Sequence, residues 1–239
     1  MGNIKAIRSV IAGLVIAAAP GVAAHAEGAW NFGDSRVGGV HAASLDATCR
    51  GTLIGADLVL TAAHCIVAIG GSLPVDPASV TFSIAGKDGV VAVHQVSDIA
   101  TDPEFFREEG APTRAFIARD IALLRLETIE KGPFDSMAPF DLNKSHIALL
   151  PVSEGAVFLA EPCKAQYEAN NIVLLSCARM KGTSGSPGYA LVNGERRVVA
   201  VISATGTQDN APITFAVNPM GLLSSLKWYA TDLARPESY

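Results

Sequence analysis

The run Thr61-Ala62-Ala63-His64-Cys65 follows directly on the apolar residues Leu58-Val59-Leu60, and the rest of the chain is best interpreted outward from it. The apolar residues are typical of a short buried strand, and the histidine stands just beyond its end. A histidine side chain accepts and returns protons near neutral pH, as a general base must. The run therefore predicts a histidine fixed at the end of a strand.

A second run, Gly182-Thr183-Ser184-Gly185-Ser186-Pro187, supplies the matching nucleophile. Its serine lies among glycines, where backbone N–H groups can point inward. A hydroxyl nucleophile with a nearby base is the core of acyl-transfer catalysis. Asp120, which precedes the apolar residues Ile121–Leu124, is the candidate acid between them. The chain order His64, Asp120, Ser184 is one of the known orders for such a triad.

Each of the three residues also has an ordinary structural interpretation. A lone histidine in a β-protein is more often a packing or surface residue, and an aspartate before a strand is often a turn residue. A serine in a glycine-rich run can belong to a flexible loop. The joint occurrence of nucleophile, base and orienting acid favours the catalytic interpretation.

The first residues have the pattern of a secretory signal peptide. Lys5 and Arg8 precede the apolar run Val10–Ala19, and Ala24-His25-Ala26 matches a small-residue cleavage site. The apolar run is short for a membrane-spanning helix, which needs about 20 residues. We therefore expect residues 1–26 to be removed and the protein to be secreted or periplasmic.

The charge balance excludes some partner classes. The whole chain has a net charge of −5, and loss of the two basic residues of the signal peptide makes it more acidic. An acidic chain without a basic cluster has no electrostatic reason to bind nucleic acid. No later segment is long and apolar enough to span a membrane. We expect a monomer that uses no cofactor. We also expect no bound metal, because no acidic cluster resembles a calcium-binding loop.

Four cysteines, an even count in a chain expected to be exported, predict two disulfides. Nearest-neighbour pairing joins Cys49 to Cys65 and Cys163 to Cys177, although the sequence alone allows three pairings. The alternative is a zinc site. It is disfavoured because no C-x-x-C spacing is present and because His64 has a better use as a base.

The chain after the signal peptide is rich in short β-branched runs separated by glycine, aspartate, asparagine and proline, which is typical of a barrel or a sandwich. A helix-spaced pattern occurs only at Met220–Leu233, after Pro219, and predicts a closing helix. Residues 131–147 resemble a linker, and Phe105–Arg114 resembles an exposed loop. The predicted strands are Thr52–Ile54, Leu58–Leu60, Val80–Ile84, Val90–Val93, Ile121–Leu126, Ile172–Leu175, Val198–Ile202 and Ile213–Val217.

Together the segments Cys49–Ile54, Val59–Cys65, Asp120–Leu124 and Gly182–Pro187 resemble the trypsin/chymotrypsin-like serine peptidases. The serine motif, with two cysteines ahead of it, is most similar to the bacterial branch that includes the glutamyl endopeptidases. The resemblance implies an all-β fold of two packed antiparallel barrels, about 37–130 and 148–239, with the active site between them. It also implies peptide-bond hydrolysis in protein or peptide substrates.

The resemblance further implies a role for each site residue. His64 would be the general base, Asp120 would orient it, and Ser184 would attack the substrate. The backbone N–H groups of Gly182 and Ser184 would form the oxyanion hole. The rival interpretation is a binding protein of the same fold without catalysis, or a latent zymogen.

The chain departs from the family pattern at its activation site. In trypsin-type zymogens a new N-terminal ammonium pairs with an aspartate just before the catalytic serine. The corresponding residue here is Thr183, which carries no charge. Although Arg36-Val37-Gly38-Gly39 resembles a tryptic activation site, we expect that cleavage after Arg36 is not the activating switch.

The specificity pocket also departs from the family pattern. Ala178 stands where trypsin-like enzymes carry the acid that selects lysine or arginine, and Ser203 replaces the histidine of glutamyl endopeptidases. Arg179 and Lys181, which lie nearby, could attract an acidic residue. We instead expect substrate-binding residues Ala178, Ser203, Ala204 and Thr205 to form a pocket for small or medium apolar side chains. The edge Ser203–Thr205 would pair with the substrate backbone.

Overall fold

The computed structural model describes residues 36–85, 91–139, 147–149, 152–153, 156–157, 162–167, 170–177, 183–223 and 226. The predicted signal peptide, Ala178, Gly182 and all but the start of the predicted closing helix lie outside these residues. Within them, no helix has the length and apolar character needed to cross a membrane.

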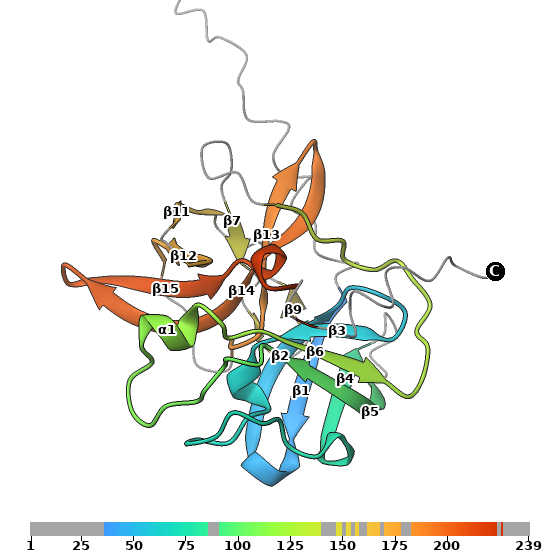
Figure 1. Cartoon of the computed structure of the whole chain (residues 1–239). Coiled ribbons are helices and arrows are strands. Elements are labelled where there is room, and N and C mark those ends of the chain that lie inside the picture. Colours follow the sequence, from blue (N-terminus) through green and yellow to red (C-terminus); the bar gives the residue numbers. More distant parts are fainter. Residues whose placement is uncertain are drawn as a thin grey trace, which may run out of the picture.

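The N-terminal half is a closed six-stranded antiparallel barrel (Figure 1). Its interior is filled by buried aliphatic and aromatic side chains, among them Val40, Leu53, Val59, Phe82 and Leu124. In order around the barrel the strands are β1 (Val37–Ala42), β2 (Ala47–Leu53), β3 (Leu58–Thr61), β6 (Ala122–Leu126), β5 (Val91–Thr101) and β4 (Val80–Ala85).

Strand β1 was not among the predicted strands, because its two glycines weaken the β-branched pattern that marks a strand. It pairs with both β2 and β4 and so closes the barrel. A Cβ atom on Gly38 would lie 2.3 Å from the carbonyl oxygen of Ser83 and 2.5 Å from the ring of Phe82. Glycine is therefore required where β1 lies against β4, although glycine disfavours a strand by propensity.

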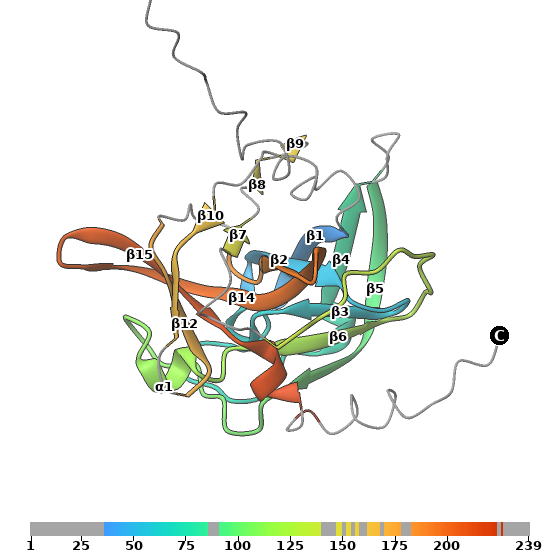
Figure 2. The same cartoon turned by 90° about the horizontal axis from the view of Figure 1, so that it is seen from above.

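The C-terminal half is a seven-stranded antiparallel sheet that curls into a half-barrel beside the first barrel (Figure 2). Its longest element is the hairpin of β14 and β15, whose turn places Asp209 and Asn210 at positive φ, as two-residue hairpin turns require. In order across the sheet the strands are β10 (Pro162–Cys163), β7 (Ile147–Leu149), β13 (Pro187–Val192), β14 (Glu195–Gln208), β15 (Ala211–Val217), β12 (Ile172–Leu175) and β11 (Ala165–Tyr167).

The prediction of two antiparallel barrels is confirmed, with the second one open. Few helices accompany the strands in the described part of the chain, and the 3₁₀ turn η4 (Pro219–Gly221) overlaps the start of the segment predicted to form a closing helix. The other described elements are η1 (Ala43–Leu45), η2 (Ala63–Cys65), η3 (Pro77–Ser79), α1 (Arg114–Ile117) and the separate pair β8 (Val152–Ser153) and β9 (Ala156–Val157).

Both disulfides form in the nearest-neighbour pairing. Cys49 on β2 is joined to Cys65 on η2, so the histidine turn is tied to the strand beside it. Cys163 ends β10, at one edge of the seven-stranded sheet, and Cys177 follows β12, near the opposite edge. The second disulfide therefore draws the two edges of the sheet together, which is consistent with its curl.

A buried carboxylate in the predicted linker joins the two halves. Asp135 accepts hydrogen bonds from Thr52 Oγ1 of β2 at 2.9 Å, from Tyr189 OH of β13 at 2.6 Å and from Arg196 of β14 at 3.0 Å. Burial, followed by the negative charge of Asp135, raises the pKa of Tyr189 well above its ordinary value. The network connects the barrel that carries His64 to the sheet that follows Ser184.

Candidate active site

His64 lies in η2, which follows β3, and contacts Asp120, which lies between α1 and β6. Its backbone N–H donates to Asp120 Oδ1 at 2.8 Å, and its Nδ1 lies 2.7 Å from Asp120 Oδ2. A carboxylate only accepts hydrogen bonds, so the neutral imidazole must carry its proton on Nδ1. Nε2 is then left with its lone pair, as a general base requires.

Asp120 is completely buried between α1 and β6, and three donors compensate the cost of burying its charge. Two of them belong to His64. The third is the hydroxyl of Ser203, which donates to Oδ2. This hydrogen-bond set holds the carboxylate in one orientation, and through it the imidazole ring.

The contact of Ser203 with Asp120 was missed by the sequence reasoning, which assigned Ser203 to the substrate pocket alone. The pairing of β14 with β15 shifts register between Ile202 and Ala204, so Ser203 is the extra residue of a β-bulge. Bulges re-aim side chains near functional sites. The sequence around Ser203 does not predict the bulge, because a bulge depends on how β14 pairs with β15, which follows after the next turn.

The turn that carries Ser184 is clamped between the two halves. Arg50 N–H of β2 donates to the carbonyl of Ser184 at 2.8 Å, and Gly185 N–H donates to the carbonyl of Ile202 at 2.8 Å. Gly185 has a φ of +80°, and a Cβ atom there would lie 2.1 Å from the carbonyl oxygen of Arg50. Only glycine allows this approach.

This clamp brings the nucleophile candidate to the histidine turn. Arg50, which holds Ser184, follows Cys49, and the disulfide partner of Cys49 is Cys65, next to His64. The same Arg50 carbonyl accepts from Thr61 Oγ1 at 2.6 Å, at the end of β3. The structure therefore gathers His64, Asp120, Ser203 and the Ser184 turn in one region. Ala204 and Thr205 continue β14 from there, whereas Gly182 and Ala178 lie outside the described residues.

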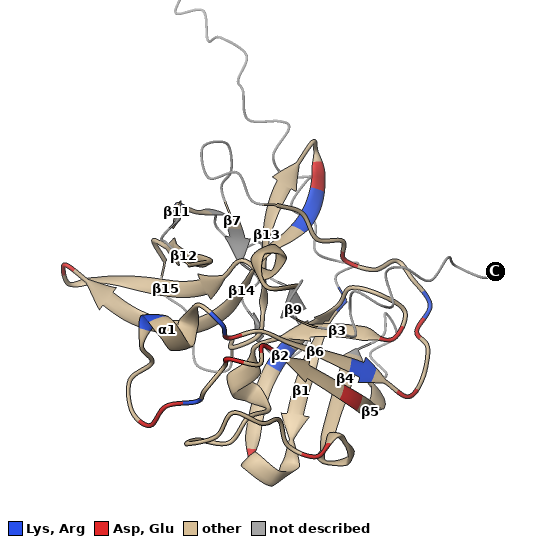
Figure 3. Ribbon diagram, viewed as in Figure 1, with Lys and Arg blue, Asp and Glu red and all other residues tan. Residues whose placement is uncertain are grey.

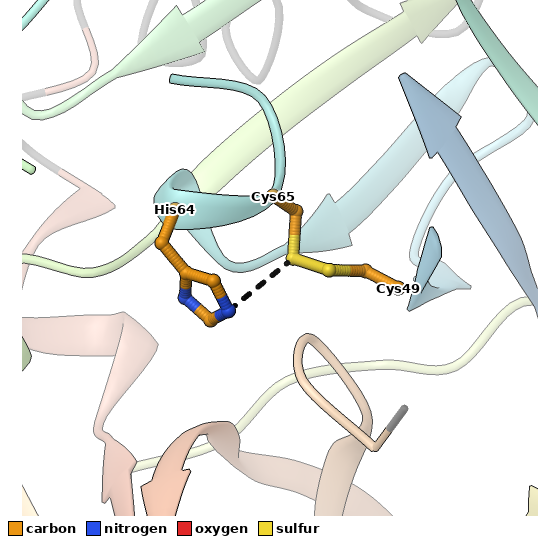
Figure 4. A group of neighbouring side chains, drawn as sticks. All are labelled: Cys49, His64 and Cys65. Atoms are coloured by element: carbon orange, nitrogen blue, oxygen red, sulfur yellow. Dashed lines mark hydrogen bonds between the residues drawn. A yellow bond between two sulfur atoms is a disulfide. The ribbon is translucent and has the colours of Figure 1, made fainter. Parts of the chain in front are cut away.

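The zinc alternative can be tested on the same residues. Ligand atoms of Cys49, His64 and Cys65 lie within 4.8 Å of one another, and His64 Nε2 is 3.8 Å from Cys65 Sγ (Figure 4). The two sulfur atoms are bonded to each other, so neither is a thiolate. Zinc takes cysteine as thiolate, so the group does not fit a zinc ion. The disulfide instead fixes the turn that carries His64.

A pocket of about 200 Å³ opens beside His64. One wall is the ring of Phe116 in α1, whose centroid lies 6.0 Å from that of the His64 ring. The segment predicted to be an exposed loop, Phe105–Arg114, supplies much of the rest, but Phe105 itself is buried beneath it. The lining residues are His64, Ile69, Arg107, Glu108, Gly110, Pro112, Phe116, Ser203 and Ala204.

The charged residues of the described chain are spread over both halves. Figure 3 shows lysine and arginine positions scattered among acidic ones on loops and strand ends, with no basic stripe along the described ribbon. Several are paired, for example Arg125 with Asp57 at 2.8 Å and Arg119 with Asp102 at 3.1 Å.

Comparison with protein families identifies the family of the chain. The family model described as Trypsin matches residues 23–165, which is more than half of the chain. The match includes His64 and Asp120 and ends before Ser184. No curated protein matches the chain. The matched length, together with the two antiparallel barrels, shows that the chain belongs to the trypsin family of serine peptidases.

Proposed function

We propose that the protein is a secreted serine endopeptidase that hydrolyses peptide bonds through an acyl-enzyme on Ser184. The observation that carries the proposal is the buried Asp120 carboxylate, 2.7 Å from His64 Nδ1 and bonded also to His64 N–H and Ser203. An arrangement that fixes the tautomer of a histidine and leaves Nε2 as a base is what nucleophilic catalysis by serine requires.

In the proposed reaction, Ser184 Oγ attacks the substrate carbonyl while His64 Nε2 takes its proton. Asp120 stabilises the imidazolium that forms. The backbone N–H groups of Gly182 and Ser184 receive the oxyanion, and His64 then protonates the leaving amine. Water, activated by the same histidine, hydrolyses the acyl-enzyme. No step needs a cofactor.

The proposal extends to the location of the protein. Residues 1–26 would be removed as a signal peptide during export, leaving barrels of about 37–130 and 148–239 joined by the linker 131–147. Two disulfides support an oxidising compartment, either the periplasm or the outside of the cell. We propose that the exported chain acts as a monomer.

The likeness of the serine motif to glutamyl endopeptidases does not lead us to propose glutamate selection. Ser203, which replaces their histidine, is buried and donates its hydroxyl to Asp120, so it brings no positive charge to the pocket. Ala178 brings none either. We propose apolar specificity, with the substrate backbone paired along Ser203–Thr205.

A fluorophosphonate probe tests the proposed activity directly, because it phosphonylates, with loss of fluoride, only a serine that an assembled triad has activated. We expect the purified mature protein to be labelled, and Ser184→Ala and His64→Ala to remain unlabelled. Mass spectrometry of the labelled peptide should place the adduct on Ser184. A folded, disulfide-bonded wild type that resists labelling would support the rival, a non-catalytic binding protein or a latent zymogen.

The structure gives a physical reason why cleavage after Arg36 should not switch activity on. The Arg36 carbonyl accepts from Leu53 N–H at 3.0 Å, its guanidinium donates to the Lys131 carbonyl at 2.8 Å, and Val37 already begins β1. A new ammonium at Val37 would stay in the barrel wall, and Thr183 could not pair with it as an anion.

We therefore expect an Arg36→Gln protein to be labelled by the probe at the same rate as the wild type. Brief treatment of the wild type with trypsin should not raise its labelling rate. The rates are measured on protein quantified by mass spectrometry, which also reports cleavage after Arg36. An inactive Arg36→Gln protein, with a sharp rise in the trimmed wild type, would contradict the expectation.

A further inference from the structure

The segment that carries Asp120 is held by a second interaction, one residue before the carboxylate that contacts His64. The segment runs from α1 into β6, and the Asp120 N–H donates to the Ile117 carbonyl at 3.2 Å. Arg119, the preceding residue, donates from Nη1 to both carboxylate oxygens of Asp102, at 3.1 and 3.2 Å. This ion pair joins the segment to the end of β5.

Asp102 is itself fixed by contacts on both of its sides. It comes directly after β5, whose last residue, Thr101, pairs with Ala122 at the start of β6. Its Oδ1 accepts from Glu104 N–H at 2.8 Å, and its carbonyl accepts from Phe105 N–H at 2.9 Å. The Phe105 side chain is buried in the core. Asp102 is therefore an anchor that is attached to a strand on one side and to a buried ring on the other.

Burial makes Asp102 the more important of the two acidic partners of Arg119. The Asp102 side chain is only 1% exposed, whereas that of Arg119 is 38% exposed. Arg119 Nη2 also contacts the carboxylate of Glu104, whose side chain is 71% exposed. Exposed ion pairs contribute little, but a buried carboxylate must keep its charged partner because it has lost its contact with water. The guanidinium is therefore held chiefly by Asp102.

The position of Asp120 has to be accurate for it to orient the imidazole. Its carboxylate oxygens lie 2.8 Å from the His64 backbone nitrogen and 2.7 Å from Nδ1. A misplacement of about 1 Å in a catalytic arrangement can lower a rate by about 100-fold. Because Arg119 and Asp120 are consecutive, a shift of the backbone between α1 and β6 would move the carboxylate as well. The ion pair with Asp102 opposes such a shift.

We propose that Asp102 is a positioning residue of the active site, which holds Asp120 against His64 through the guanidinium of Arg119. Asp102 acts on the backbone that carries Asp120 and contacts none of the reacting groups. This inference rests on the proposed peptidase function. It goes further by adding to the triad a buried ion pair that determines where its acid lies.

Two single variants test the proposal. Asp102→Asn keeps the shape of the side chain and an acceptor for Glu104 N–H but removes the charge that holds Arg119. Arg119→Gln removes the guanidinium from the more exposed side of the pair. We expect each to lower kcat for a fluorogenic peptide by about 10- to 100-fold. KM should stay close to that of the wild type, because neither side chain lines the pocket beside His64.

A double variant and a matched control connect the loss to this ion pair. The combination of Asp102→Asn with Arg119→Gln should lower kcat no further than the more damaging single substitution, because both remove the same contact. Glu104→Gln is the control, since it removes only the exposed partner of the same guanidinium and should leave kcat unchanged. Near-ultraviolet circular dichroism shows whether each variant is folded.

Proton NMR gives a readout that a purely stabilising role of the ion pair would not change. The proton on His64 Nδ1, which faces the Asp120 carboxylate at 2.7 Å, should give a resonance far downfield of the amide protons. We expect this resonance to be sharp in the wild type and in Glu104→Gln. In folded Asp102→Asn and Arg119→Gln it should broaden or move upfield, because a longer hydrogen bond protects the proton less from exchange with water.

The outcomes separate this inference from the proposed function. If kcat in both single variants equals that of the control, or if only KM changes, the inference is overturned and the peptidase proposal stands. Effects that multiply in the double variant, or a His64 resonance that stays unchanged, would overturn it too. A folded wild type that neither takes the fluorophosphonate probe nor cleaves peptides would reject the peptidase proposal, and the inference with it.

Discussion

Asp120→Asn is expected to lower kcat by about 10⁴-fold at neutral pH while leaving the protein folded. The carboxylate accepts from His64 N–H, from His64 Nδ1 and from Ser203. An amide keeps the shape but has an NH₂ group on one side. If the NH₂ group faces Nδ1, the imidazole proton must lie on Nε2. Nε2 then has no lone pair with which to accept the proton of Ser184.

The measurement is kcat for a fluorogenic peptide, with the near-ultraviolet circular dichroism spectrum as the check on folding. Asp57→Asn is the matched control, because Asp57 pairs with Arg125 at the end of β3 opposite to His64 and should leave kcat unchanged. Ser203→Ala removes one of the three donors to Asp120 and should cost less than Asp120→Asn. A fall of less than tenfold in Asp120→Asn would show that His64 is not oriented by Asp120 during the reaction.

Asp135→Ala is expected to lower the free energy of unfolding by about 3–5 kcal/mol, the usual cost of removing one partner of a buried ion pair. The substitution removes the acceptor of Thr52, Tyr189 and Arg196 at the junction of the two halves. Without the Asp135 carboxylate, the Arg196 guanidinium would keep its charge in a largely buried position. Its Cζ lies 5.0 Å from the Tyr189 ring centroid.

Urea unfolding of the disulfide-intact protein measures this loss. Glu195→Ala is the control, because Glu195 pairs with Arg197 at the exposed start of β14 and such pairs contribute about 1 kcal/mol or less. A loss in Asp135→Ala no larger than in the control would show that the network does not hold the halves together.

The pKa of Tyr189 gives this prediction an independent readout. The raised pKa means that the folded state favours the neutral phenol, so its contribution to stability is present below about pH 10 and declines as the pH rises further. In Asp135→Ala the pKa of Tyr189 should fall, because a negative neighbour is lost, but burial should keep it above the ordinary value. Absorbance of the tyrosinate at alkaline pH follows this change.

Local patterns in the sequence predicted a β-rich chain, and the resemblance of its motifs to the trypsin-like family implied the two barrels and the roles of the candidate triad. The predicted strands lie within or next to strands of the structure, because short β-branched runs between turn residues carry their own signal. The runs around His64, Asp120 and Ser184 each resemble a motif of the family, and the match over residues 23–165 confirms the family itself. The even cysteine count predicted two disulfides but left their pairing open.

Only the tertiary structure decided the features that depend on neighbours distant in sequence. Gly38 lies in a strand because β4 passes too close for a Cβ atom, and Ser203 reaches Asp120 because a bulge turns it there. Asp135 resembles an ordinary linker residue in the sequence, but in the structure it accepts hydrogen bonds from both halves of the chain. Propensity and periodicity act over a few neighbouring residues, whereas these contacts join residues 45 to 83 positions apart, which no local pattern records.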